Sequence, residues 1–191
     1  MKKNILKVIV LVIIDQLIKL VVLNTIAKTG ESITIIPKFL QLTYVENFGG
    51  AFGIFMTRIL LIGVNLLIIF VIIKLLTSKK YDFDNKAKLG FSLILSGGIG
   101  NLIDRIFRGY VIDYIDITQI FNYPVFNFAD ICIVVGVILI MAMIIFNTIR
   151  TQEKVWKCVY IQTHYYKGPQ YISPCVGLLC KILNIIMIKK E

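Results

Sequence analysis

Charged and amide side chains occur inside long apolar stretches of this sequence, where they could carry out chemistry. An unpaired charge is costly in such surroundings, and ionisable residues in a membrane segment are candidates for function by default. The polar residues in or beside the apolar runs include Asp15, Lys19, Asn101, Asp104, Arg105, Asp113 and Asp130. Their types limit the chemistry that is available.

Carboxylates are the groups best placed to act as acid and base. The single histidine, His164, lies near the C-terminal end of the chain, and Ser96 has no matched lysine as a base. Two carboxylates held close together cannot both ionise easily, so one keeps a proton. The ionised member can then deprotonate a water that attacks a peptide carbonyl, while the other polarises that carbonyl. Asp113 and Asp130 are the candidates, because both are expected at a membrane boundary where water is available.

Other functions remain open on residue types alone. Asp104, Asp113 and Asp130 could form a site for a hard metal cation, which prefers oxygen ligands. Lys19 and Arg105 argue against this alternative, since fixed cations compete with a bound one, and we expect neither a metal nor another cofactor. A proton- or ion-coupled transporter and a purely structural membrane protein also fit the residue types.

The elements that must position these residues are membrane helices. Hydrophobic residues make up 58% of the 191 residues, and the mean hydropathy is +0.83. A helix needs about 20 apolar residues to cross a hydrocarbon core of about 30 Å. Residues 5–26, 59–76, 89–107 and 128–149 are long enough to do so. The sequence therefore predicts an integral membrane protein.

The charge pattern predicts the orientation of these spans. The net charge is +10, but lysines and arginines cluster beside the apolar runs, which argues against a nucleic-acid-binding surface. The positive-inside rule places both chain ends in the cytoplasm, with the first span kept as an uncleaved helix. Residues 1–150 would form one membrane domain. Residues 151–191 would form a cytoplasmic tail, with residues 175–188 lying on the membrane surface.

Helical spacing brings several polar residues together. Asp15 and Lys19 are four residues apart and share a helix face, either as part of a site or as an ion pair that only fixes helix packing. Asn101 aligns in the same way with Asp104 and Arg105. These groups, together with Asp130 at the start of the last span, should lie near the extracytoplasmic face.

Two loop regions add polar groups at this face. Residues 31–46 alternate β-branched or aromatic residues with polar ones, which indicates short strands outside the membrane. Asn47 follows them in a glycine-rich turn. Asn127 could cap the last span and leave Asp130 in its first turn, where the helix dipole favours a carboxylate.

Four sequence motifs, in order, resemble those of the bacterial lipoprotein signal peptidases, also called prolipoprotein or type II signal peptidases. The resemblance covers about residues 5–150. The motifs are Asp15-Gln16-x-x-Lys19, Asn47-x-Gly-Gly-Ala-Phe52, Gly98-x-Gly-Asn101-x-x-Asp104-Arg105 continuing through Gly109-x-Val-x-Asp113, and Phe126-Asn127-x-Ala-Asp130.

The resemblance implies a fold and an activity. It implies an all-α integral membrane protein with four transmembrane helices, a small extracytoplasmic β-cradle and a short extracytoplasmic helix over the active site. The activity would be an aspartic endopeptidase that cuts diacylglyceryl-modified prolipoproteins immediately before the lipidated cysteine. The protein would act as a monomer in the cytoplasmic membrane, in contact with lipid. Asp113 and Asp130 match the catalytic pair. The positions that match site support or substrate contact are Asp15, Lys19, Asn47, Asn101, Asp104, Arg105 and Asn127.

Overall fold

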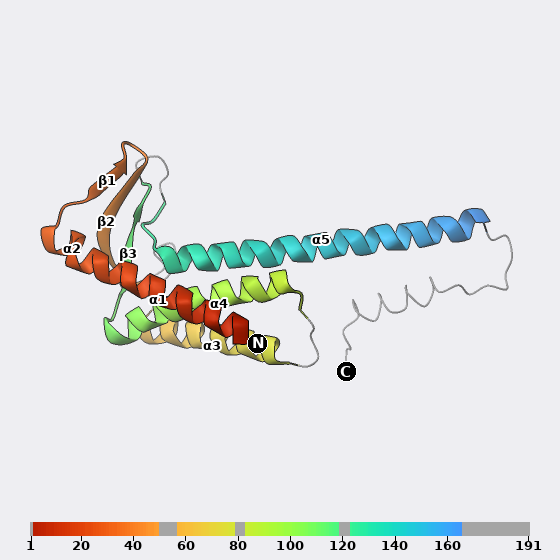
Figure 1. Cartoon of the computed structure of the whole chain (residues 1–191), viewed down its shortest axis with the longest axis horizontal. Coiled ribbons are helices and arrows are strands. Elements are labelled where there is room, and N and C mark those ends of the chain that lie inside the picture. Colours follow the sequence, from red (N-terminus) through yellow and green to blue (C-terminus); the bar gives the residue numbers. More distant parts are fainter. Residues whose placement is uncertain (1, 50–56, 79–82, 119–122, 166–191) are drawn as a thin grey trace. The chain divides into compact units, whose positions relative to one another are not determined.

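Four long helices and a small sheet make up a computed structural model that describes residues 2–49, 57–78, 83–118 and 123–165. The chain divides into two compact units, residues 1–140 and 141–191. The elements in chain order are α1 (Lys2–Asn24), α2 (Ile26–Thr29), β1 (Ile33–Ile36), β2 (Leu40–Asn47), α3 (Arg58–Thr77), α4 (Asn85–Phe107), β3 (Val111–Asp116) and α5 (Phe128–Tyr165) (Figure 1).

The predicted apolar runs are helical, and they differ in polarity. By length and composition, Arg58–Thr77 and Phe128–Lys154 could each cross a membrane, with mean hydropathies of 3.0 and 2.9. Both α1 and α4 have 23 residues, but they carry the polar residues of the motifs. Polar side chains are thus concentrated on two helices that pack against each other.

Helix α4 lies in the middle of the first unit and packs against α1, α3 and the beginning of α5. Glycines permit the close approach. A Cβ atom at Gly97 would collide with the backbone oxygen of Ala129 in α5, and one at Gly100 would lie 2.5 Å from Oδ2 of Asp15 in α1. On its third side, Asn65 of α3 donates a hydrogen bond of 2.9 Å to the carbonyl of Gly98. The small residues of α4 therefore let the neighbouring helices pack closely against it.

The sheet has the strand order β1-β2-β3, and both pairs are antiparallel. Strand β1 lies within the segment predicted to form strands, residues 31–46, and β2 extends one residue beyond it, to Asn47. The buried residues Ile112 and Tyr114 of β3 pack with Val22 of α1 and Ile26 of α2. This apolar cluster fixes the sheet against the end of α1. The short helix α2 contributes to the cluster, while the prediction of a short helix over the site stays a prediction.

Strand β3 lies between the third and fourth predicted spans, in a segment without a predicted strand. It continues directly from the end of α4 and pairs with β2, so that Val45 lies opposite Asp113. An isolated bridge joins Ile115 to Phe126, with Ile115 N donating to Phe126 O at 2.8 Å and Phe126 N donating back at 3.1 Å. This bridge brings the segment before α5 alongside β3.

The described part of the second unit, residues 141–165, is helical and continues α5. The helix runs past the predicted end of the last span at residue 149. Gly168 and Pro169 are the first glycine or proline after Gly136, so no helix breaker intervenes. The predicted surface helix at residues 175–188 lies outside the described residues.

Candidate active site

Asp113 is buried and held by two asparagine side chains. Asn47 Nδ2 donates to its Oδ2 at 2.8 Å, and Asn127 Nδ2 donates to its Oδ1 at 2.6 Å. Asn47 reaches Asp113 because its backbone pairs with Val111, so that the two side chains are diagonal neighbours on one face of the sheet. Both carboxylate oxygens therefore have amide donors.

Asp130 is fixed by a reciprocal cap at the start of α5. Its backbone N–H donates to Asn127 Oδ1 at 3.0 Å, and its Oδ2 accepts from the backbone N–H of Asn127 at 3.1 Å. This is a capping box, in which the residue before the helix and the third helical residue satisfy each other. The predicted cap is confirmed. The same asparagine also holds Asp113, so Asn127 joins the two carboxylates.

The other N–H groups of the first turn of α5 bind side chains from different elements. Ala129 N donates to Asp15 Oδ1 at 3.2 Å, and Phe128 N donates to Tyr114 Oη at 3.2 Å. The N–H groups at the start of a helix have no partner within the helix. Here α1 and β3 supply the partners, which fixes the start of α5 relative to both.

Asn101 connects the two aspartates to a buried lysine. Its Nδ2 donates to Asp130 Oδ1 at 2.8 Å, while its Oδ1 accepts from Lys19 Nζ at 3.1 Å and from Asn127 Nδ2 at 3.2 Å. Lysine only donates hydrogen bonds, and an ionised carboxylate only accepts them. The orientation of the Asn101 amide is therefore determined by its neighbours.

A compact ion-pair network lies beneath Asn101. Lys19 Nζ is 3.0 Å from Asp15 Oδ2 and 2.7 Å from Asp104 Oδ2, and none of these side chains is more than 2% exposed. Arg108 forms a further ion pair with Asp104, and its Nη1 donates to Gln16 Oε1 at 3.2 Å. Two carboxylates thus face two cations, which is the arrangement that buried charges require.

Asp104 also links this network to the strand that carries Asp113. Its Oδ2 accepts from the backbone N–H of Ile112 at 3.3 Å. Ile112 directly precedes Asp113. The ion-pair network therefore holds β3 in place and does not contact the Asp113 carboxylate through any of these bonds.

Arg105, in the last turn of α4, lies near the two aspartates. It donates to Gly49 O at 3.3 Å and to Asn101 O at 3.4 Å, and it is attracted electrostatically to Asp130 and Asp113. The loop after β2 is thereby joined to the end of α4. A positive charge in this position could orient an oxygen of a bound substrate.

The environment of Asp113 favours a proton on this carboxyl group. Burial is the largest cause and raises its pKa to about 6, and the nearby Asp130 carboxylate acts in the same direction. The hydrogen bonds from Asn47 and Asn127 oppose the rise because they stabilise the ionised form. Asp113 can therefore exchange a proton close to neutral pH.

The structure brings together the side chains of all the residues selected from the sequence. They are Asp15, Lys19, Asn47, Asn101, Asp104, Arg105, Asp113, Asn127 and Asp130. The rest of the second motif, residues 50–52, lies outside the described residues. Sequence reasoning gave no role to Gln16, Arg108 or Tyr114. The spacing of Asp104 and Arg108, four residues apart on one helix, was a signal for this ion pair.

The alternative of a metal site is not supported by the positions of the three aspartates. Asp104 is occupied by Lys19 and Arg108, whereas Asp113 and Asp130 share Asn127. Within the described ranges, no group of three or more His, Cys, Asp or Glu side chains is arranged to hold a metal ion.

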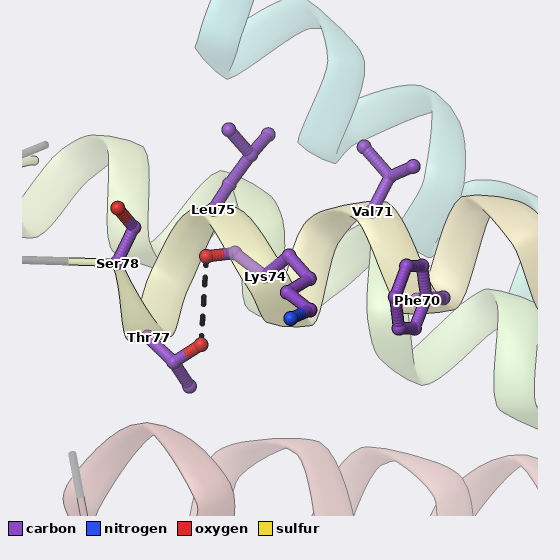
Figure 2. A pocket seen from close by; sticks show the side chains of 6 residues that line it. All are labelled: Phe70, Val71, Lys74, Leu75, Thr77 and Ser78. Carbon is purple, nitrogen blue, oxygen red and sulfur yellow. Dashed lines mark hydrogen bonds between the residues drawn. The ribbon is translucent and has the colours of Figure 1, made fainter. Parts of the chain in front are cut away.

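A hollow of about 520 Å³ lies elsewhere, on the C-terminal half of α3. It is lined by Phe70, Val71, Lys74, Leu75, Thr77 and Ser78 (Figure 2). Phe70 is twelve residues beyond Arg58, or about 18 Å along the helix at 1.5 Å per residue. The hollow contains none of the polar motif residues. Volume alone therefore does not identify the site, whereas the buried polar contacts do.

The chain is similar to several known proteins. The sequence model described as signal peptidase II matches residues 7–146. The lipoprotein signal peptidase of Clostridium acetobutylicum is 42% identical over 156 residues, covering 80% of this chain and 99% of that protein. The lipoprotein signal peptidase of Fusobacterium nucleatum is 38% identical over 146 residues, covering 76% of this chain and 87% of that protein.

Further similarity comes from a third relative and from solved structures. The lipoprotein signal peptidase of Staphylococcus aureus strain JH9 is 36% identical and covers 79% of this chain and 93% of that protein. A bacterial membrane enzyme solved by the in meso method at 2.3 Å resolution is 31% identical, with a TM-score of 0.70 over 78% of this chain and 90% of that one. A second, solved at 1.9 Å resolution, has a TM-score of 0.67.

Proposed function

The chain belongs to the signal peptidase II family, and from this premise we propose that it removes signal peptides from diacylglyceryl-modified prolipoproteins by an aspartate pair. The bond cut is the peptide bond immediately before the lipidated cysteine. The observation that carries the proposal is the sharing of Asn127 by Asp113 and Asp130, through bonds of 2.6 Å and 3.1 Å.

The reaction uses one ionised and one protonated carboxyl group. Asp113 acts as the proton donor, because burial raises its pKa to about 6 and so lets it carry a proton close to neutral pH. The Asp130 carboxylate takes a proton from a water molecule, whose oxygen attacks the peptide carbonyl carbon. Asp113 donates its proton to the carbonyl oxygen, giving a tetrahedral intermediate. The intermediate breaks at the C–N bond when Asp130 passes the proton it gained to the leaving nitrogen, and one hydroxyl of the intermediate returns a proton to Asp113.

The remaining polar residues hold this pair in position. Asn47 and Asn127 orient Asp113, and Asn101 orients Asp130. Asp15, Lys19 and Asp104 support the site from below through ion pairs and bonds to the backbone of β3 and α5. Arg105 is placed to contact substrate. All these groups come from one chain, which supports activity as a monomer.

The site lies at the extracytoplasmic end of four membrane-spanning helices, α1, α3, α4 and the first part of α5. The charge pattern supports this orientation. Lys86 and Lys88 lie at the start of α4, and Lys74 lies in the last turn of α3, so these lysine-bearing helix ends face the cytoplasm. The sheet and the aspartate pair are at the other ends of these helices. This position would admit a membrane-bound substrate from the side and water from outside.

The test is cleavage of a purified diacylglyceryl-modified precursor by the protein in detergent or lipid. We expect Asp113→Asn and Asp130→Asn each to reduce cleavage by at least about a thousandfold, because each removes an essential proton-transfer group. Both variants should still elute as folded, monodisperse protein. Normal cleavage by either variant would contradict the aspartate mechanism, and ion flux through proteoliposomes without cleavage would favour a transporter.

Asp116→Asn is the matched control. Asp116 is a buried carboxylate on the same strand, but it accepts from Gln41 Nε2 at 2.6 Å and from Thr118 N at 2.8 Å, away from the pair. This variant should cleave at close to the wild-type rate. A loss of cleavage in all three variants would point to damage to β3 as a whole.

A further inference from the structure

Arg58, the first residue of α3, contacts the end of α4. Its Nε donates to the carbonyl of Arg105 at 2.7 Å, and its Nη2 donates to the carbonyl of Ile106 at 2.9 Å. The side chain therefore reaches across to two consecutive carbonyls of a neighbouring helix. None of the four motifs includes this residue.

These carbonyls belong to a helix end that needs partners. The last carbonyls of an α-helix have no N–H group of the same helix to bind. The carbonyl of Asp104 accepts from Arg108 N at 2.8 Å and from Gly109 N at 3.2 Å, where the chain leaves the helix. Arg58 supplies donors to the next two carbonyls, and its positive charge suits the negative end of the helix dipole.

The turn into β3 packs against the same guanidinium. Gly109 has a φ of +93°, a left-handed conformation that favours glycine, and a Cβ atom there would lie 3.4 Å from Arg58 Nη1. Asp113 follows Gly109 by four residues. The Asp104 carboxylate holds the end of this connection by accepting a hydrogen bond from Ile112 N. Arg58 packs against its beginning, at Gly109.

Arg58 also binds the backbone of Arg105, whose guanidinium interacts electrostatically with the aspartate pair. Arg105 projects from the backbone unit that Arg58 holds, and its own guanidinium contacts Gly49 and Asn101. A small change in the direction of this backbone would be magnified at the tip of so long a side chain. Misplacement by about 1 Å can reduce catalysis by as much as a hundredfold.

We infer that Arg58 is a positioning residue, which clamps the end of α4 so that Arg105 and the strand carrying Asp113 keep their places around the reacting groups. The inference rests on the proposed peptidase activity. It assigns Arg58 no contact with substrate. The clamp acts through two backbone carbonyls and the packing at Gly109.

The test compares Arg58→Ala and Arg58→Lys with the wild-type protein in the precursor assay. We expect Arg58→Ala to lower kcat per folded enzyme by about tenfold while KM changes by less than about twofold. Arg58→Lys keeps the charge and one or both donors, so it should recover part of the loss. The alkaline limb of the pH profile should also move to higher pH in Arg58→Ala, because a displaced Arg105 no longer favours the ionised form of Asp113.

Lys74→Ala is the control on the same helix. Lys74 is a cation near the opposite end of α3, 5.6 Å from the ring of Phe70, and lies in the hollow of Figure 2. This variant should keep the wild-type kcat and pH profile. This control distinguishes two causes of lost activity. One is the loss of any positive charge on α3, and the other is the loss of the contacts between Arg58 and the end of α4.

Three outcomes would overturn the inference. One is a kcat within twofold of wild type in Arg58→Ala, with Asp113→Asn inactive, which would leave the peptidase proposal intact. Another is a lower thermal midpoint with unchanged kcat per folded enzyme and an unmoved pH profile, which would make Arg58 purely structural. The third is a wild-type protein that cleaves no lipidated precursor, which would overturn the proposed function and this inference with it.

Discussion

Three asparagines determine how the two aspartates face each other. Each uses its oxygen and its nitrogen for different partners: Asn47 bonds Gly49 N and Asp113, Asn101 bonds Lys19 and Asp130, and Asn127 bonds Asp130 N and Asp113. An aspartate in any of these places would present an acceptor to another carboxylate. Amides are therefore the side chains that this arrangement requires.

The proton on Asp113 predicts the pH dependence of cleavage. Its pKa is raised to about 6, mainly by burial. The protonated form is the active acid, so the active fraction is full below this pKa and is lost as the pH rises through it. We expect kcat/KM to fall about tenfold per pH unit on this limb, measured from pH 5 to 9 with the free enzyme and limiting substrate. A rate that instead rose through this range would mean that Asp113 acts as the base.

Replacing Asn47 should move this limb in a defined direction. The hydrogen bond from Asn47 lowers the pKa of Asp113, so Asn47→Ala should shift the limb to higher pH, whatever happens to the maximal rate. Gln41→Ala removes the corresponding amide donor from Asp116 and serves as the control. An unchanged limb in Asn47→Ala, or an equal shift in Gln41→Ala, would contradict the role of this bond.

Much of the residue-level site could be predicted from the sequence, because the cost of charge in apolar segments singles out its members. The pairs Asp15–Lys19 and Asn127–Asp130 follow from helix spacing and capping, which are local rules. Gln16 could not be predicted in this way. Its amide bonds Gly100 and Asp104, and these partners are more than eighty residues away in the sequence.

At the scale of elements, the glycine-rich face of α4 sets the distances between helices. A Cβ atom at Gly100 would lie 2.5 Å from Asp15 Oδ2 and 3.4 Å from the Cβ of Ala129. The Asp15 carboxylate cannot move aside easily, because it binds Lys19 and Ala129 N. We expect Gly100→Ala to destabilise the protein by about 1–3 kcal/mol and to lower cleavage. Thermal unfolding in detergent provides the measurement.

Gly63→Ala is the matched control for this substitution. Gly63 is also in a helix, but among the described residues no atom other than its chain neighbours and its own helix backbone lies within 4 Å of a Cβ built there. Alanine favours helix more than glycine does, so this variant should be as stable as the wild type or slightly more so. Equal destabilisation by both substitutions would mean that helix packing at Gly100 is not the cause.

The helices could be predicted from hydropathy, whereas β3 could not. Residues 111–114 and 116 of this strand are buried, so the strand lacks the alternation of apolar and polar residues that marks a half-exposed strand. The strand also has two aspartates among its six residues, and aspartate is uncommon in strands. Its burial arises from contacts with β2, Phe126 and α1, which are set by the tertiary fold.

The first unit as a whole has polar residues inside and apolar residues outside. Asp15, Lys19 and Asp104 are at most 1% exposed. By contrast, Leu67 of α3 and Ile138 of α5 are 61% and 59% exposed. In water, this arrangement would leave most of the apolar surface exposed to solvent, which is unfavourable. In a bilayer the same surface contacts lipid, and the polar interior is satisfied by its own partners.

The proposed division at residue 150 can be tested by replacing residues 151–191 with green fluorescent protein. All the contacts of the candidate site lie within residues 1–140. The segment of α5 that remains, residues 128–150, would be about 34 Å long, enough to cross a hydrocarbon core. We therefore expect the fusion to cleave precursor within about twofold of the full chain.

The fusion should also fluoresce, because the reporter folds only if it stays in the cytoplasm. Alkaline phosphatase joined at the same residue should be inactive for the same reason. An active phosphatase would reverse the orientation of the last span, and a dark but stable fusion would contradict the cytoplasmic position of residue 150. Loss of cleavage with correct reporter signals would instead assign residues 151–191 to the working enzyme.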